Sequence, residues 1–142
     1  MERAFVGAEL LESGLTRSQL RWRYKGVHPR IYVPRGAPSS VQLSAHAAWL
    51  WTDRRGIVGG RAAAALHGAE WVNPETPIDM IAPRERPQRG VIIRNERVDW
   101  DEICTVGEVA VTTPARTALD LARHLDRDVA VRHLEHWRRR PA

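Results

Sequence analysis

The stretch 15–36 changes its hydrophobic period part-way along, which constrains the chain to a helix followed by a strand. Thr16 and Gln19 have the spacing of a capping box, so a helix is predicted to begin directly after Thr16. This helix is expected to end near Gly26. Beyond it, apolar and polar residues alternate as far as Val33, which predicts a short strand.

Six basic side chains and no acidic one lie between Arg17 and Arg35, on the predicted helix and strand and directly after them. A capped basic helix followed by an edge strand is what a winged helix-turn-helix module presents to DNA. We expect the helix arginines to reach the groove and its phosphates, and the later cations to hold the DNA backbone. The candidate DNA-binding residues are Arg17, Gln19, Arg21, Arg23, Lys25, His28, Arg30 and Arg35. The alternative is a solvated polar helix and hairpin.

Positive charge is concentrated at the N-terminal end of the chain. Residues 1–36 hold seven basic and three acidic side chains, whereas residues 37–125 hold ten basic and eleven acidic ones. Residues 126–142 hold five basic and three acidic ones, and the net charge of the 142 residues is +5. A positive end on a nearly neutral body indicates a polyanionic partner, because neutralising phosphates releases their counterions.

The remaining pattern predicts an α+β fold. Residues 1–36 are expected to form the small winged helix-turn-helix-like module, and residues 37–142 a compact α/β domain. The expected helices span 4–13, a stretch from Ser39 or Ser40 to about Asp53, 59–68, a stretch beginning at Thr113, and 127–138. The expected strands span 57–58, 77–82, 91–95, 103–106 and 109–111.

The helix that begins at Thr113 contains a candidate ion pair. Arg116 and Asp120 stand four residues apart, so they can meet on one helical face. We interpret this pair as a structural clamp that joins the helix to the sheet, with catalysis as the alternative. Thr117 fits capping and packing equally well. The residues given a structural role are Thr16, Thr113, Arg116, Thr117 and Asp120.

The motifs of two related enzyme classes are missing. A restriction-type nuclease needs an acidic residue two positions before a lysine, but the single lysine, Lys25, follows Arg23 at that spacing. A nucleotidyltransferase would show Gly-Ser with a nearby Asp-x-Asp, but the pair at 59–60 is Gly-Gly and the Asp-x-Asp at 99–101 comes far later. We therefore expect no enzymatic activity, no catalytic residue and no cofactor.

Other polar clusters have simpler explanations than a metal site. Asp99, Asp101 and Glu102 have ligand chemistry that suits Mg²⁺, but an exposed acidic loop anchored by Trp100 is the preferred reading. The histidine pair His133 and His136 has no third ligand at useful spacing, so a polar helix face is expected instead.

Two histidines and one tryptophan outside these clusters are expected to have structural roles. His46 and His67 are expected to form hydrogen bonds at the edge of the core. Trp22 is expected to pack beside its short helix, with stacking on a sugar or base as the alternative.

No apolar run is long enough for a signal peptide or a membrane span, which predicts a cytoplasmic protein.

Four segments in a fixed order carry a family resemblance: GLTRSQL, IYVPRG, GIVGGRAAAALHG and VAVTTPARTALDLAR. In this order they resemble the AbiEi antitoxins of type IV toxin–antitoxin systems, closest to the actinobacterial branch with a reduced N-terminal helix-turn-helix. The most specific segments are 59–68 and 113–120. Many actinobacterial relatives continue into a C-terminal restriction-endonuclease-like domain, so the resemblance implies a short paralogue or the N-terminal part of such a protein.

The resemblance implies a DNA-binding module that represses its own operon and an α/β domain that opposes a nucleotidyltransferase-type toxin. The expected partners are double-stranded DNA and such a toxin. The alternative is a protein-interaction module that does not bind DNA. It would be an antitoxin body whose DNA-binding part has decayed, or the targeting half of a split nuclease.

Overall fold

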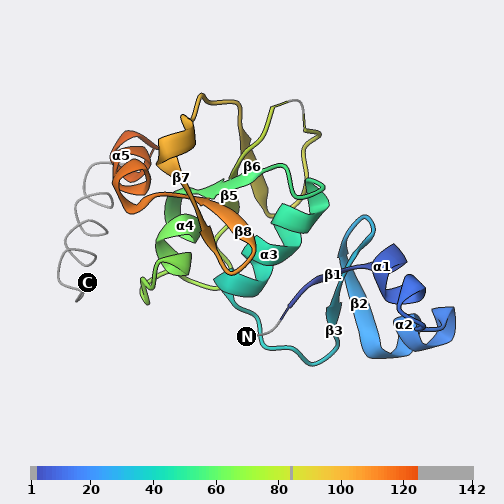
Figure 1. The fold of residues 1–142 in the computed structure, drawn as a ribbon. Coiled ribbons are helices and arrows are strands. Elements are labelled where there is room, and N and C mark those ends of the chain that lie inside the picture. Colours follow the sequence, from blue (N-terminus) through green and yellow to red (C-terminus); the bar gives the residue numbers. More distant parts are fainter. Residues whose placement is uncertain (1–2, 84, 125–142) are drawn as a thin grey trace.

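The computed structural model describes residues 3–83 and 85–124. Two β-sheets, one of three strands and one of five, lie side by side (Figure 1). Helix α3 (Val41–Trp51) contacts strands of both sheets. The predicted α+β class is therefore confirmed, as a small N-terminal sheet with helices followed by a mixed sheet with helices.

The N-terminal module, residues 5–34, contains the three-stranded sheet. Its elements are β1 (Phe5–Val6), α1 (Gly7–Glu12), α2 (Arg17–Arg23), β2 (Tyr24–His28) and β3 (Ile31–Pro34). Strand β3 is central and pairs antiparallel with β1 on one side and β2 on the other. Strand β2 is therefore an edge strand.

Two boundaries around α2 differ from the prediction. The helix ends at Arg23, and Tyr24 is already extended because it pairs with Pro34 on β3. The predicted single strand is a hairpin whose turn contains Pro29 and Arg30. Pro29 therefore lies outside the hydrogen-bonded strands β2 and β3, where its missing N–H has no effect on strand pairing. Arg30 adopts a positive φ of 69° in the turn.

The first predicted helix also begins later than expected. Phe5 and Val6 form β1 because they pair with Tyr32 and Ile31 of β3, and α1 starts only at Gly7. The Phe5 ring meets the Tyr24 ring edge-on, with 5.7 Å between centroids. Pairing with a strand distant in sequence overrides the local helical preference.

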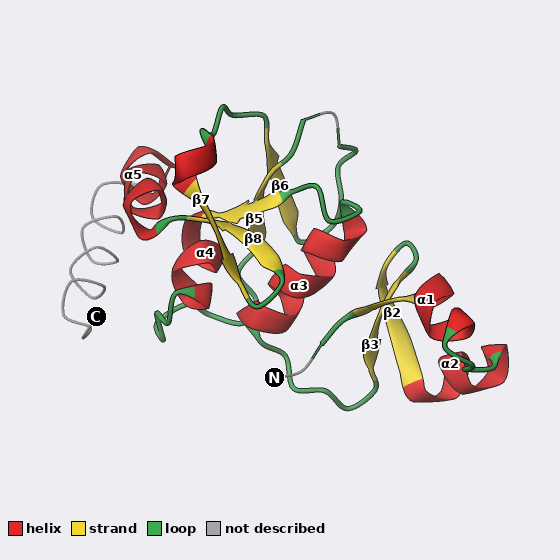
Figure 2. Cartoon of the chain, viewed as in Figure 1, coloured by secondary structure: helices red, strands yellow, loops and turns green. Residues whose placement is uncertain are grey.

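The five-stranded body, residues 41–124, follows the predicted order of elements. After α3 come β4 (Ile57–Gly59), α4 (Gly60–Leu66), β5 (Ile78–Ile81), β6 (Val91–Arg94), η1 (Trp100–Glu102), β7 (Ile103–Val106), β8 (Val109–Thr112) and α5 (Pro114–His124) (Figure 2). The strand order is β6-β5-β4-β8-β7, with β4 parallel to β8 and β5 parallel to β6.

The helix boundaries of the body are set by local signals. Ser40 caps α3 by accepting a hydrogen bond from the Leu43 amide at 3.0 Å. Gly68 ends the turn after α4 with a φ of +107°. Thr113 Oγ1 accepts a hydrogen bond from the Arg116 amide at 3.3 Å at the start of α5. These caps were predicted and are confirmed.

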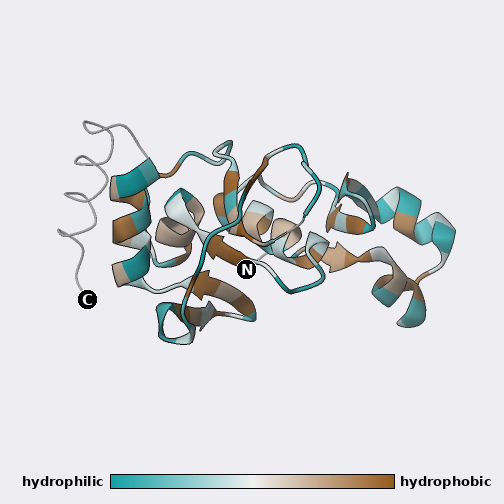
Figure 3. Ribbon diagram, turned by 90° about the horizontal axis from the view of Figure 1, so that it is seen from above, coloured by the Kyte–Doolittle hydropathy of each residue, from teal (hydrophilic) through white to brown (hydrophobic). Residues whose placement is uncertain are grey.

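The hydrophobic core is continuous between the two sheets. Ile31 and Val33 of the N-terminal module belong to the same buried cluster as Val58 and Met80 of the body. Several strand arrows in Figure 3 are brown, the colour of hydrophobic residues. No helix among the described residues is long and apolar enough to span a membrane. The helix predicted at 127–138, with His133 and His136, lies outside the described residues.

Candidate nucleic-acid interface

Helix α2 is fixed at its N-terminus by the predicted capping box. Thr16 Oγ1 accepts a hydrogen bond from the Gln19 amide at 3.0 Å, and Gln19 Oε1 accepts one from the Thr16 amide at 2.9 Å. Gly14, with a φ of +110°, permits the sharp turn between α1 and α2. The Gln19 oxygen is therefore engaged in the cap, although the residue was expected to contact DNA.

Four cations of α2 and β2 carry charge that no carboxylate of the described residues neutralises. All four are exposed, and none forms an ion pair with a residue in the described part of the chain: Arg17, Arg21, Arg23 and Lys25. Helix α2 lies at the end of the N-terminal module that faces away from the five-stranded body (Figure 1). These charges are thus available to an external polyanion.

The other two predicted cations, Arg30 and Arg35, are exposed but have partners. Arg30 Nη1 lies 3.5 Å from Asp53 Oδ1, and both side chains are more than half exposed. Arg35 Nε donates to the backbone carbonyl of Arg21 at 3.2 Å. Arg35 therefore keeps its charge and ties the end of β3 to α2, whereas the charge of Arg30 is partly offset.

His28 lies between the hairpin and the body rather than on the outer surface. Its ring packs at 6.0 Å from the Trp51 ring, and its Nδ1 accepts a hydrogen bond from the Gln88 amide group at 2.9 Å. Burial lowers the pKa of this histidine below its ordinary value. The described contacts of His28 are internal.

Trp22 is not packed against the module. Its exposed fraction is 76%, so the preferred expectation of a packing residue is wrong. The helix is short, and Leu20 and Gln19 occupy its half-buried side. The indole is instead exposed on α2, where Arg21 and Arg23 flank it in the sequence.

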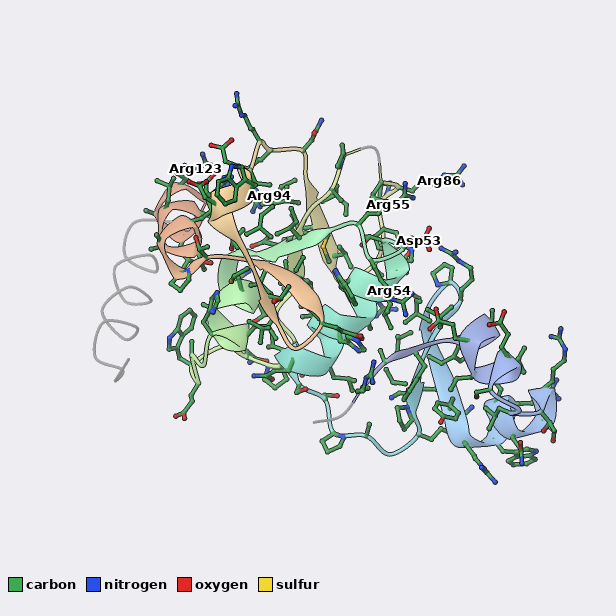
Figure 4. The ribbon with its side chains drawn as sticks, in the orientation of Figure 1. Asp53, Arg54, Arg55, Arg86, Arg94 and Arg123 are labelled. Atoms are coloured by element: carbon green, nitrogen blue, oxygen red, sulfur yellow. The ribbon has the colours of Figure 1, made fainter. Side chains whose placement is uncertain are left out.

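The N-terminal module is attached to the body by polar contacts as well as by the shared core. Arg54 donates to both carboxylate oxygens of Glu9, at 2.9 and 3.0 Å. Figure 4 shows Arg54 on the side of the body that faces the module. The Ala4 amide donates to His46 Nδ1 at 2.9 Å, and His46 Nε2 lies 2.6 Å from Glu108 Oε1. The hydrogen bonds expected for His46 are confirmed.

The predicted pair on α5 is the centre of a buried network. Arg116 Nε donates to Asp120 Oδ1 at 3.0 Å, and Arg116 Nη1 donates to Glu102 Oε1 at 3.1 Å and to the Arg97 carbonyl at 2.9 Å. One guanidinium therefore joins α5 to η1 and to the loop after β6. The bonds of Arg116 thus run to segments that flank the sheet and not to a strand, and the structural clamp stays a prediction.

Two threonines attach α5 to β8. Thr117 Oγ1 donates to the Thr113 carbonyl at 2.8 Å and lies 2.7 Å from Thr112 Oγ1. His67 Nε2 donates to the Thr112 carbonyl at 2.8 Å, as expected for a histidine at the core edge. The end of β8 is thereby bonded to both α4 and α5.

Comparison with known families decides what this body is. Residues 56–139 match the AbiEi antitoxin C-terminal domain, which is more than half of the chain. The chain belongs to the AbiEi antitoxin family. No curated protein matches it significantly. The family match begins at β4, so α3 and the N-terminal module precede the matched AbiEi domain.

The AbiEi domain contains a buried carboxylate, Asp79, that was not predicted from the sequence. Asp79 on β5 is buried, and this burial raises its pKa above the ordinary value, against the opposing charges of Arg94 and Arg61. A Cβ atom on Gly60 would overlap the Asp79 carboxylate, so the chain passes directly over it. The available signal was a charged residue within the apolar run of β5.

The AbiEi domain also brings Glu96, Asp120 and His124 together, with potential ligand atoms within 4.8 Å of one another. The two carboxylates already have cationic partners. Arg123 Nη2 lies 2.8 Å from Glu96 Oε2, and Arg116 Nε lies 3.0 Å from Asp120 Oδ1. Figure 4 shows Arg123 and Arg94 on the side remote from the N-terminal module. We therefore interpret this group as a charge network rather than a metal centre.

The acidic turn of the AbiEi domain does not form a convergent site. Glu102 bonds Arg116, Asp99 bonds Arg97 at 3.4 Å, and Asp101 is exposed. Trp100 is 86% exposed, so the expectation that it anchors this loop is wrong. The loop is held instead by the capping box between Asp99 and Glu102.

Proposed function

We propose that this chain is a DNA-binding antitoxin that represses its own operon and opposes a nucleotidyltransferase-type toxin. Residues 1–36 would form the DNA-binding module and residues 37–142 the antitoxin domain. The observation that carries the proposal is the set of four unpaired cations on α2 and β2. In a chain whose remaining part is nearly neutral, this local charge favours a polyanion over any other class of partner.

The order of elements in the N-terminal module supports a winged helix-turn-helix arrangement. Two helices follow one another across a tight turn, and the second is the more basic. The β2–β3 hairpin comes next, and its second strand, β3, pairs with β1, the strand that precedes the helices. In this arrangement α2 is the helix offered to the major groove, and the β2–β3 hairpin is the wing.

The proposed contacts follow from which charges are free. Arg17, Arg21 and Arg23 would reach the groove and its phosphates, and Lys25 would hold the backbone beside them. Arg30 and Arg35 would add backbone contacts from the wing turn and the end of β3. Gln19 and His28 would act indirectly, because the first completes the cap and the second seats the hairpin on the body.

The antitoxin role rests on the AbiEi family match. We propose that the domain acts by binding and not by catalysis, since the Gly-Gly pair at 59–60 stands where a nucleotidyltransferase needs Gly-Ser. Co-expression with a nucleotidyltransferase encoded beside its gene should restore growth that the toxin alone arrests. Continued arrest with a folded, expressed chain would contradict the antitoxin role.

The DNA-binding role is tested with a duplex that spans the region upstream of the chain's own gene. Fluorescence anisotropy should give tighter binding to this duplex than to an unrelated duplex of equal length. Circular dichroism should confirm that the protein is folded. A folded protein that binds neither duplex would contradict the DNA-binding role and favour a protein-interaction module.

A further inference from the structure

Among the described residues, two tryptophans project into solvent, in surroundings of opposite charge. Trp22 lies between Arg21 and Arg23 on α2, and Trp100 lies between Asp99 and Asp101 at η1. An exposed indole has about 150–250 Å² of surface to bury, so each is a candidate anchor for a partner. The charge around each indole indicates which kind of partner it would meet.

The indole of Trp22 lies on the exposed side of α2 beside Arg21, whereas Arg23 projects between the half-buried positions 19 and 20. Arg17 and Arg21 are four residues apart, and so are Ser18 and Trp22, which places these two pairs side by side along the helix. All four residues are exposed. The half-buried Leu20 lies on the opposite side of the helix from Trp22. A partner that meets the arginines of α2 therefore also meets Trp22.

We propose that Trp22 packs its indole against thymine methyl groups in the major groove of the bound DNA. The inference rests on the proposed DNA-binding function and adds a base-reading contact to it. Among the groups that base edges present in the major groove, the thymine methyl is the apolar one. The flanking arginines would bring the helix to the phosphates, where the indole gains affinity only if it finds an apolar surface.

The charge around Trp22 argues for DNA and against a protein partner. A protein that buried Trp22 would also have to neutralise or desolvate the four free cations around it. A DNA duplex supplies that neutralisation along its whole length. The opposite holds at Trp100, whose two flanking carboxylates would be repelled by phosphates. Trp100 is therefore a matched control for exposure, size and residue type.

The test removes the methyl group from the DNA and the indole from the protein, separately and together. The upstream region is amplified once with thymidine triphosphate and once with deoxyuridine triphosphate, which gives the same duplex without thymine methyls. Dissociation constants are measured by anisotropy for the wild type, Trp22→Ala, Trp22→Phe and Trp100→Ala. This design does not require the position of the binding site to be known.

The wild type should bind the uracil duplex several-fold more weakly, because roughly fourfold in affinity accompanies each buried methyl group. Trp22→Ala should lose about tenfold or more on the thymine duplex and show no further loss on the uracil duplex. Trp22→Phe should keep part of the methyl dependence. Trp100→Ala should behave as the wild type on both duplexes.

Three results would overturn the inference while leaving the proposed function intact. These are an unchanged affinity of Trp22→Ala for the thymine duplex, no methyl dependence in the wild type, or an equal uracil penalty with and without the indole. The last result would mean that the indole packs on the sugar–phosphate backbone. A wild type that binds neither duplex would overturn the proposed function itself.

Discussion

The guanidinium of Arg116 donates to Asp120 across 3.0 Å, and the two residues are only 6% and 3% exposed. Removal of Arg116 would leave the buried Asp120 carboxylate with only the half-exposed Arg123, whose Nη2 lies 3.4 Å from Asp120 Oδ1, as a cationic partner. Arg116→Ala is therefore expected to lower the free energy of unfolding by about 3–5 kcal/mol in urea titrations. The DNA affinity of the protein that remains folded should not change.

A double variant separates charge burial from simple packing loss in this network. Arg116→Ala combined with Asp120→Ala should recover part of the stability lost by Arg116→Ala alone, because the stranded carboxylate is gone. Arg123→Ala, at a position whose side chain is nearly half exposed, should have a much smaller effect. Equal losses for the exposed and the buried arginine would contradict the proposed clamp.

Gly60→Ala is expected to destabilise the fold severely. Gly60 has a φ of +57°, and an added Cβ would overlap the buried Asp79 carboxylate. Gly107 has nearly the same φ, +63°, but a Cβ there would meet nothing within 4 Å. The matched variant Gly107→Ala therefore measures the backbone strain alone. Urea unfolding should show a clearly larger loss at Gly60, and equal losses would mean that the close approach to Asp79 is unimportant.

The pH dependence of stability should contain a contribution from His28. Because burial lowers its pKa, the folded protein binds this proton more weakly than the unfolded chain does. The contribution is full above the ordinary pKa of 6.5 and is lost as the pH falls from there toward the lowered folded-state value. Urea unfolding at several pH values between 8 and 5 should show a steeper acid loss in the wild type than in His28→Gln. Parallel pH profiles would contradict this assignment.

The parts of the fold that could be predicted from the sequence are those with local causes. The cap at Thr16, the cap at Ser40 and the glycine after α4 involve residues within a few positions of one another. The strand at Phe5 could not be predicted in this way, because its cause is pairing with Tyr32 on β3. The early end of α2 at Tyr24 has the same kind of cause.

The site was predicted in outline for a similar reason. A run of basic residues without acidic neighbours is visible in the sequence, and four of them form no ion pair within residues 3–83 and 85–124. The partner of Arg30 comes from the turn after α3 and that of His28 from the loop before β6, which no local pattern identifies. The exposure of Trp22 depends on how little of α2 the small module can cover, and this is a property of the assembled fold.

Thr16→Ala is expected to lower the free energy of unfolding by about 1 kcal/mol through loss of the cap. Because α2 carries the proposed contacts, DNA affinity should fall as the helix frays. Ser18→Ala, in the first turn of the same helix, should change stability by less than about 0.5 kcal/mol. Thermal unfolding and anisotropy on both variants check the comparison. Equal effects at the two positions would show that the capping box does not stabilise α2.

The central claim is that DNA binding resides in α2 and β2 and is electrostatic. If the four unpaired cations meet phosphates, the logarithm of affinity should fall against the logarithm of salt concentration with a slope of about −3.6. Arg21→Ala or Lys25→Ala should make this slope shallower by about 0.9 each. Arg97→Ala removes the same charge from a side chain that is 91% exposed in the body, and it should leave the slope unchanged.

The most direct measurement is therefore an anisotropy titration of the upstream duplex at several salt concentrations, with the wild type, Arg21→Ala, Lys25→Ala and Arg97→Ala. The account predicts a steep slope that only the α2 and β2 variants reduce. It is contradicted by a folded wild type without salt-dependent affinity, or by an Arg97→Ala variant that reduces the slope as much as Arg21→Ala does.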